Sequence, residues 1–275
     1  SAADDSGNQL HNTGKKPLLL VVDDNQIILS YLQSFLSRYF QVLAAPDGKV
    51  AWEMALEHLP DIVLTDLVMP ELDGLQLTDK LKAHELTCHI PVVMLSARAE
   101  VEDRIQGHQH GADGFVPKPF HEQELVLILQ NMLLLQERWR KRFESGHSSG
   151  KPVQETDPVH QEESDHKDPF MRRLYGIFEA HFSEEDFDLD QLCHQMLISR
   201  SQLQRKLSAV ASESAMELLR DFRLNKAKEL FIHHPYIQVK EVCTKVGFKN
   251  PAHFSTLFAK RFGASPSELR KRLED

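Results

Sequence analysis

Short apolar runs alternate with amphipathic stretches over the first half of the chain. The apolar runs have the length and residue types of strands and cover residues 18–22, 41–44, 62–65, 91–95 and 114–116. The stretches between and after them have helical spacing and cover residues 25–39, 47–58, 75–84, 101–110 and 121–135. Five strand–helix units in series predict an α/β fold with a doubly wound, five-stranded parallel sheet. In such a sheet the ligand site lies at the carboxyl ends of the strands.

The second half of the chain has helical patterns only. They cover residues 170–182, 189–196, 200–210, 215–233, 239–246, 251–262 and 266–273. Residues 189–210 and 239–262 each follow the order helix, short turn, helix, and the long helix 215–233 separates them. The pattern predicts an all-α domain with two helix-turn-helix units in series.

Composition marks the borders between these parts. Residues 1–16 are polar, which indicates a flexible lead-in, and the first domain covers residues 17–143 because its last helix runs on to Phe143. Residues 144–168 are rich in Ser, Gly, Pro, Glu and His and carry almost no apolar residue, so we expect a linker there. The helical domain then covers residues 169–275.

The net charge of −9 conceals an asymmetry between the two halves. Residues 17–136 carry 17 acidic and 7 basic side chains, whereas residues 191–272 carry 6 acidic and 15 basic ones. A concentration of one sign of charge in one domain favours a partner of the opposite sign. We therefore expect a cation or cationic partner for the first domain and a polyanion for the second.

Acidic side chains follow two strands at the carboxyl edge of the predicted sheet. Asp23 and Asp24 come directly after the first strand, and Asp66 ends the third. Clustered carboxylates raise one another's proton affinity unless a cation lies among them, and Mg²⁺ is the hard divalent ion expected with oxygen ligands. Ser96 at the end of the fourth strand and Lys118 after the fifth add a hydroxyl and a positive charge. This set suits transfer of a phosphoryl group onto a carboxylate.

A cofactor site of the flavodoxin type is the competing use of this fold. Its first loop must hold phosphate, and the adjacent carboxylates Asp23 and Asp24 would repel phosphate in the absence of a metal. The five residues at successive strand ends therefore favour the phosphoryl-accepting site.

Four segments of the first domain, VVDDN, LTDLVMPELDG, LSARAE and GADGFVPKPF, resemble the receiver domain of response regulators. The resemblance implies that Asp66 is the phosphoacceptor. It also implies that Asp24 ligates Mg²⁺ directly, that Asp23 does so through water, and that the backbone carbonyl of Val68 supplies a further ligand.

The same resemblance gives roles to residues of the last two strands. Ser96 is the expected switch hydroxyl, Phe115 the aromatic side chain that turns inward with it, and Lys118 the lysine of the family. The Lys118–Pro119 peptide bond is expected to be cis, a form found in about 5–6% of bonds before proline. Pro117 departs from the family pattern and removes a backbone donor just before the lysine. It leaves the five-residue set intact.

Two helices of the second domain have polar and basic outer faces. In residues 200–210 the apolar anchors are Leu203, Leu207 and Val210, and the outward residues are Arg200, Ser201, Gln202, Gln204, Arg205 and Lys206. Around residues 251–262 the anchors are Phe254, Leu257, Phe258 and Phe262, and the available residues are Lys249, Asn250, His253, Ser255, Thr256 and Lys260. Either helix alone could be an ordinary solvated face. Two such helices in a basic domain favour DNA contact, since Arg and Gln pair bidentately with guanine and adenine edges.

The helical domain resembles the DNA-binding domain of the AraC/XylS family. The similarity is closest in VKEVCTKVGFKNPAHFSTLFAKRFGASPSELRKRL and extends to SRSQLQRKL and RDFRLNKAKEL. The sequence departs from the family at Ser212 and Ala215, where Gly and Pro are common. The resemblance implies binding of double-stranded promoter DNA. A helix at 215–233, with a rise of about 1.5 Å per residue, can hold the two units about one DNA turn apart.

These features together predict a two-component response regulator. A histidine kinase, separate or fused upstream, would phosphorylate Asp66, and the receiver would then change its self-association as a homodimer and tune binding to promoter DNA. The domain order resembles the cytoplasmic tail of hybrid two-component regulators, and a fragment of a hybrid kinase fits the sequence. We expect no catalysis beyond the receiver's own phosphoryl transfer and dephosphorylation. The alternative is a receiver that acts as a phosphoryl sink or docking module beside constitutive DNA binding.

The expected location is the cytoplasm. The three cysteines, Cys88, Cys193 and Cys243, are far apart and odd in number, which is typical of free thiols in a reducing compartment. The longest wholly apolar runs are residues 18–22 and 125–129, so we expect neither a transmembrane helix nor direct membrane contact.

Overall fold

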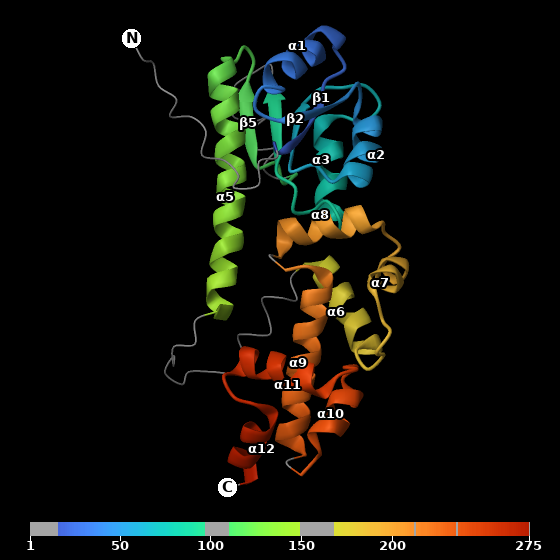
Figure 1. The fold of residues 1–275 in the computed structure, drawn as a ribbon. Helices are drawn as coiled ribbons and strands as arrows, with labels where there is room; N and C mark the ends of the chain where they lie inside the picture. Colours follow the sequence, from blue (N-terminus) through green and yellow to red (C-terminus); the bar gives the residue numbers. More distant parts are fainter. Residues whose placement is uncertain (1–15, 97–109, 149–167, 212, 235, 275) are drawn as a thin grey trace, which may run out of the picture. The chain divides into compact units, whose positions relative to one another are not determined.

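The computed structural model describes residues 16–96, 110–148, 168–211, 213–234 and 236–274. The chain divides into two compact units, Ser1–Val153 and Gln154–Asp275 (Figure 1). The division falls between residues 153 and 154, inside the stretch predicted to be a linker. Within the described ranges no helix combines the length and the apolar character that a membrane span requires.

The first unit is built on a parallel sheet of five strands, as predicted. The strands are β1 (Leu18–Val22), β2 (Gln41–Ala45), β3 (Ile62–Asp66), β4 (Val92–Ser96) and β5 (Gly114–Pro117). Their order across the sheet is β2-β1-β3-β4-β5, and all four neighbouring pairs are parallel. Pro117 is the last residue of β5, an edge strand, and the carbonyl of its register partner Ser96 accepts the N–H of Lys118. This order places β1 and β3 side by side at the centre.

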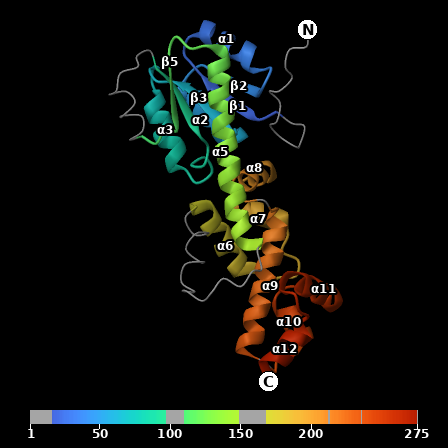
Figure 2. The ribbon, with the colours of Figure 1, turned by 90° about the vertical axis from the view of Figure 1, so that its left-hand side faces the viewer.

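Helices cover both faces of the sheet. They are α1 (Gln26–Leu36), α2 (Gly48–His58), α3 (Gly74–Ala83) and α5 (Glu122–Ser148). One core joins the sheet to α1 and α5, and a second joins its other face to α2 and α3; α5 lies in front of the sheet in Figure 2. The helix predicted at 101–110 lies outside the described residues except for its last position.

Side-chain caps explain where several of these helices begin. The carboxylate of Asp47 accepts the backbone N–H of Val50, and the amide oxygen of Asn25 accepts that of Ile27. The capping residue itself is not helical. Helices α1 and α2 therefore start one residue later than the periodicity of the sequence suggests.

The second unit is entirely helical in its described part. Its helices are α6 (Pro169–His181), α7 (Leu189–Met196), α8 (Arg200–Val210), α9 (Ala215–His233), α10 (Val239–Lys245), α11 (Pro251–Phe262) and α12 (Pro266–Glu274). The pairs α7–α8 and α10–α11 are the two predicted helix-turn-helix units, and α9 connects them (Figure 1). Ser212, one of the two predicted departures, lies outside the described residues, and Ala215 begins α9.

An aromatic core holds the second of these pairs against α9. Phe231 of α9 packs edge-on against Phe258 of α11, with ring centroids 5.8 Å apart. Gly247 has a positive φ of 73°, and a Cβ there would lie 2.4 Å from the carbonyl oxygen of Phe182. Only glycine satisfies both the left-handed backbone and this close approach. Among the described residues Cys88, Cys193 and Cys243 are free thiols, as predicted.

Candidate functional site

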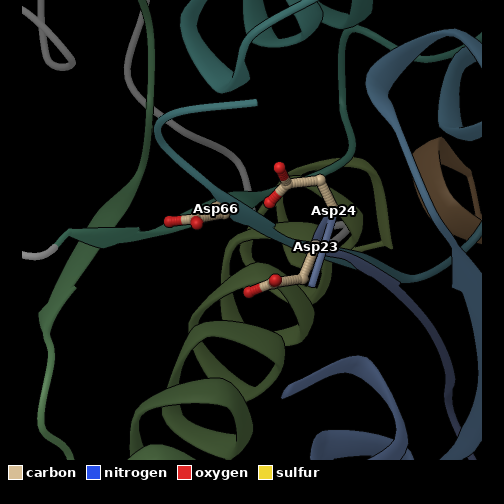
Figure 3. A group of neighbouring side chains, drawn as sticks. All are labelled: Asp23, Asp24 and Asp66. Atoms are coloured by element: carbon tan, nitrogen blue, oxygen red, sulfur yellow. The ribbon is translucent and has the colours of Figure 1, made fainter. Parts of the chain in front are cut away.

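Three carboxylates converge at the carboxyl edge of the sheet. Asp23 and Asp24 follow β1, and Asp66 is the last residue of β3 (Figure 3). Each offers an oxygen, and these three oxygens all lie within 4.8 Å of one another. Asp23 is fully buried, Asp66 is half-buried and Asp24 is exposed. The group is therefore rooted in the sheet and open to solvent on one side.

Local backbone bonds orient two of these side chains. One oxygen of Asp23 accepts the N–H of Asn25 at 2.9 Å, and Oδ1 of Asp66 accepts the N–H of Leu67 at 2.9 Å. The loop after Asp66 turns back at once, because the N–H of Gly74 donates to the carbonyl of Leu67 at 3.0 Å. A Cβ on Gly74 would lie 2.3 Å from the carbonyl oxygen of Asp66. The absence of a side chain at this position lets the first turn of α3 pack against the strand end.

Lys118 brings a positive charge to the same place. Its ammonium lies 3.0 Å from Oδ2 of Asp66 and 3.1 Å from Oδ2 of Asp23. The backbone N–H of Lys118 donates to the carbonyl of Ser96 at 2.7 Å, and the Lys118–Pro119 bond is cis, as expected. One ammonium thus faces three carboxylates, which leaves the site with an excess of negative charge.

Burial raises the pKa of Asp66 above its ordinary value. This desolvation outweighs the hydrogen bond and the charge of Lys118, which act in the opposite direction, and the charge of Asp23 adds to the increase. A second cation among the carboxylates would favour the ionised form of Asp66. Clustered carboxylate oxygens are ligands that suit a hard divalent ion such as Mg²⁺.

The remaining residues predicted for this site lie on β4, on β5 and in the loop after β3. Ser96 is buried at the end of β4, next to Pro117 of β5 in the register of the sheet. Phe115 is half-buried on β5, and the side chain of Val68 is exposed in the loop after β3.

Most residues predicted to contact DNA lie at the surface of the second unit. On α8 the exposed ones are Arg200, Ser201, Gln204 and Arg205, and at α11 they are Lys249, Asn250, His253, Thr256 and Lys260. Gln202 and Ser255 are half-buried.

Several of these polar groups are engaged within the helices themselves. The side-chain amide oxygen Oε1 of Gln202 accepts the N–H of Ser199, and the side chain of Asn250 accepts two N–H groups at the start of α11. The hydroxyls of Ser255 and Thr256 donate to backbone carbonyls one turn earlier. In this state these groups shape the ends and faces of the helices.

The prediction that Lys206 is an outward residue of α8 is wrong. Its side chain is fully buried, and its ammonium donates to Oδ2 of Asp168 at 3.0 Å. Lys206 follows Leu203 by three positions and so lies on the same inner face of α8. The helical spacing itself was the signal for this placement, and the basic residue type obscured it.

Two carboxylates that sequence reasoning missed pair with predicted DNA-binding cations. Asp190 of α7 receives two N–H groups of Arg200, with Nε to Oδ1 at 2.6 Å. The carboxylate of Asp186 forms an ion pair with the ammonium of Lys249. Hydrogen bonds from these partners lower the pKa of both aspartates. The partners are separated by 10 and 63 positions, and no sequence pattern links them.

Two family models match the chain. The model of the response regulator receiver domain matches residues 19–130, and that of a helix-turn-helix domain matches residues 192–272. Among known relatives, Histidine kinase P4 of Formosa agariphila is 29% identical over 272 residues, which is 99% of this chain and 19% of that protein. Response regulator Rre1 of Synechocystis is 41% identical over 121 residues, 43% of this chain and 52% of the relative. Transcriptional regulatory protein SrrA of Staphylococcus aureus is 38% identical over 116 residues, 42% and 47% respectively.

Two solved receiver-domain structures are similar to part of this chain. The receiver domain of Francisella response regulator 1452 is 32% identical, with 43% of this chain and 96% of that one covered and a TM-score of 0.40. The receiver domain of a Pseudomonas aeruginosa sensor histidine kinase, with a magnesium ion in its active-site cleft, is 31% identical over 43% of this chain and 98% of that one, with a TM-score of 0.41.

The chain spans about half the length of the two regulators and about a fifth of the histidine kinase. The two family matches do not overlap, and they fall in the two units of the structure. Residues 19–130 are therefore a response regulator receiver domain, and residues 192–272 of the same chain are a helix-turn-helix domain of the AraC type.

Proposed function

We propose that this chain is a two-component response regulator in which phosphorylation of Asp66 controls the binding of residues 169–275 to promoter DNA. The observation that carries the proposal is the position of Asp66. Its carboxylate ends β3, contacts the Lys118 ammonium at 3.0 Å, and lies beside two further carboxylates on the solvent-open side of the sheet.

Each residue of the site has a role in the transfer. A carboxylate oxygen of Asp66 bonds to phosphorus as the bond from phosphorus to the imidazole nitrogen of a phosphohistidine breaks; that nitrogen keeps the electron pair and takes up a proton from solvent water. Lys118 neutralises charge on the acceptor and on the phosphoryl oxygens. The Leu67 N–H bond to Oδ1 of Asp66 fixes the direction of the nucleophile. We assign Ser96 as the hydroxyl that binds the phosphoryl group and Phe115 as the ring that moves with it.

The acidic group fits a magnesium ion. Three carboxylate oxygens within 4.8 Å of one another face a single ammonium, so hard oxygen donors and uncompensated negative charge occur together. Asp23, Asp24, Asp66 and the carbonyl of Val68 would hold the ion. When bound, Mg²⁺ supplies positive charge beside the phosphoryl oxygens.

The helical domain supplies the output. Its exposed basic and amide side chains on α8 and α11 form the proposed DNA-contacting set. Helix α9, which connects the two helix-turn-helix pairs, is about 28 Å long. This length is close to one turn of B-DNA, about 34 Å, so we expect two successive major-groove contacts from one chain. The proposed domain limits are 17–143, 144–168 and 169–275, after the lead-in 1–16.

The proposed partners follow from the two sites. A histidine kinase, separate or fused upstream, supplies the phosphoryl group; the alignment of nearly the whole chain with a fifth of Histidine kinase P4 supports the fused form. We also propose homodimerisation through the receiver, a cytoplasmic location and no catalysis beyond the receiver's own phosphoryl chemistry. Leu127 and Leu135 of α5 are exposed and offer apolar contacts for a second copy.

Phosphorylation is tested with acetyl phosphate and Mg²⁺ on the full chain, followed by intact-mass measurement. The parent should gain one phosphoryl group, and Asp66→Asn should gain none. Asp79→Asn, which changes an exposed aspartate of α3, is the matched control and should be labelled like the parent. Equal labelling of Asp66→Asn would show that another residue is the acceptor.

A further inference from the structure

The ammonium of Lys206 lies in the interior of the helical unit. The residue has no exposed surface, although it belongs to the helix whose outer face carries the proposed DNA contacts. An unpaired charge in the interior costs several kcal/mol, so buried lysines are retained only with a partner. The structure places such a partner at the start of the unit.

That partner is Asp168, the first residue described after the gap at 149–167. Its Oδ1 accepts the N–H of Phe170 at 2.8 Å and so caps α6, while its Oδ2 accepts the Lys206 ammonium at 3.0 Å. The ring of Phe170, which is fully buried, lies 5.5 Å from the same ammonium. One carboxylate therefore fixes the start of α6 and the middle of α8 together.

We propose that the Asp168–Lys206 pair is a clamp that positions α8 for sequence recognition, so that Lys206 acts in DNA binding without touching DNA. Successive residues of a helix are rotated by about 100°. Holding Lys206 inward therefore fixes the angular position of Gln204 and Arg205, its exposed neighbours on α8. The proposal rests on the proposed function, because it concerns how the helical domain reads DNA.

The clamp also lies where the chain from the receiver enters the helical unit. Asp168 directly follows the segment that joins the two units, and Lys206 belongs to the first helix-turn-helix pair. The position of this entry point and the orientation of α8 are thus set by the same pair of side chains.

The test compares Lys206→Met with Arg205→Met in the full chain. Each variant removes one positive charge from α8, the first from the buried face and the second from the exposed face. Affinity is measured across a salt series for two duplexes: one selected by the parent protein from a random-sequence pool, and a scrambled version of it. Lys206→Met should reduce the ratio of the two affinities by about tenfold, a loss comparable to that of one base contact, and leave the salt dependence on the scrambled duplex unchanged.

Two results would overturn the proposal. If Lys206→Met weakens both duplexes by the same factor and lowers the salt slope by about one, Lys206 contacts phosphate. If the ratio of affinities stays at the parent value, the pair does not position α8.

A second variant guards against loss of folding. Asp168→Asn keeps an acceptor that can cap α6 but removes the charge opposite Lys206. This variant should also lower the ratio of the affinities for the selected and scrambled duplexes. An unchanged ratio contradicts the clamp. If the parent itself binds neither duplex, the proposed function fails and the positioning role fails with it. In that case thermal melting of Asp168→Asn, Lys206→Met and the double variant still reports whether the two side chains are energetically coupled.

Discussion

Replacement of Gly74 by alanine should slow phosphorylation of Asp66, although Gly74 is not one of the residues proposed to bind the phosphoryl group or the metal. The added Cβ would lie 2.3 Å from the carbonyl oxygen of Asp66 and 3.1 Å from Cα of Leu67, whereas ordinary contacts begin at 3.4 Å. The start of α3 must therefore move by about 1 Å from the strand end, or the strand end must move. Overpacking of this kind costs ~1–3 kcal/mol of unfolding free energy. A displacement of about 1 Å at a reacting group can cost about 100-fold in rate.

The assay has two readings on the full chain. Urea-induced unfolding should give a lower midpoint for Gly74→Ala, although alanine has the better helix propensity by about 1 kcal/mol. The rate of labelling by acetyl phosphate should fall by about two orders of magnitude. Gly176→Ala in α6 is the matched control: apart from its chain neighbours and the backbone of its own helix, no atom of the described residues lies within 4 Å of the added Cβ, so only the gain in propensity should remain. Parent-like stability and labelling in Gly74→Ala would refute the reasoning.

Three further predictions concern the charged groups. Asp24→Ala should abolish the rise in melting temperature that Mg²⁺ gives the parent, because the substitution removes the exposed ligand of the acidic group. A rise as large as that of the parent would exclude Asp24 as a ligand. Burial raises the pKa of Asp66, so its contribution to stability is complete below the pKa of an unfolded aspartate and declines as pH rises through the folded pKa. In metal-free buffer Asp66→Asn should therefore be more resistant to urea than the parent at neutral pH, with the difference vanishing in acid; equal midpoints at neutral pH contradict this. Asp190→Asn should free Arg200 and raise the affinity for selected and scrambled duplexes alike, with a steeper salt dependence. Asp186→Asn should have the same effect through Lys249. Unchanged salt slopes in these variants would show that the two ion pairs do not compete with DNA.

The fold could be predicted from the sequence because the strand-like apolar runs and the helical spacing are both clear. Strand and helix positions differ from the predicted ones by only a few residues, and the differences at the helix starts come from caps such as Asn25 and Asp47. The acidic group was accessible for a topological reason. Residues at the ends of β1 and β3 of a parallel sheet must meet at one edge, and the order β2-β1-β3-β4-β5 makes these two strands neighbours.

Contacts between side chains that lie far apart in the sequence could not be predicted from the sequence pattern. The charge of Lys206 predicts a surface position, and no sequence pattern links this residue to Asp168, its partner 38 positions earlier. The engagement of Arg200 by Asp190 has the same origin. Gly74 carried no signal either, because its role depends on the approach of α3 to the carbonyl of Asp66 in three dimensions.

The central claim is that phosphorylation of Asp66 controls DNA binding, and one measurement tests it most directly. The affinity of the full chain for a duplex selected from a random pool is measured with Mg²⁺ alone and with Mg²⁺ plus acetyl phosphate, for the parent and for Asp66→Asn. A coupling of about 1–3 kcal/mol, typical between two linked sites, predicts a change in parent affinity of about 5- to 150-fold and no change in Asp66→Asn. Equal affinities of labelled and unlabelled parent would contradict the account and indicate a phosphoryl sink beside constitutive DNA binding.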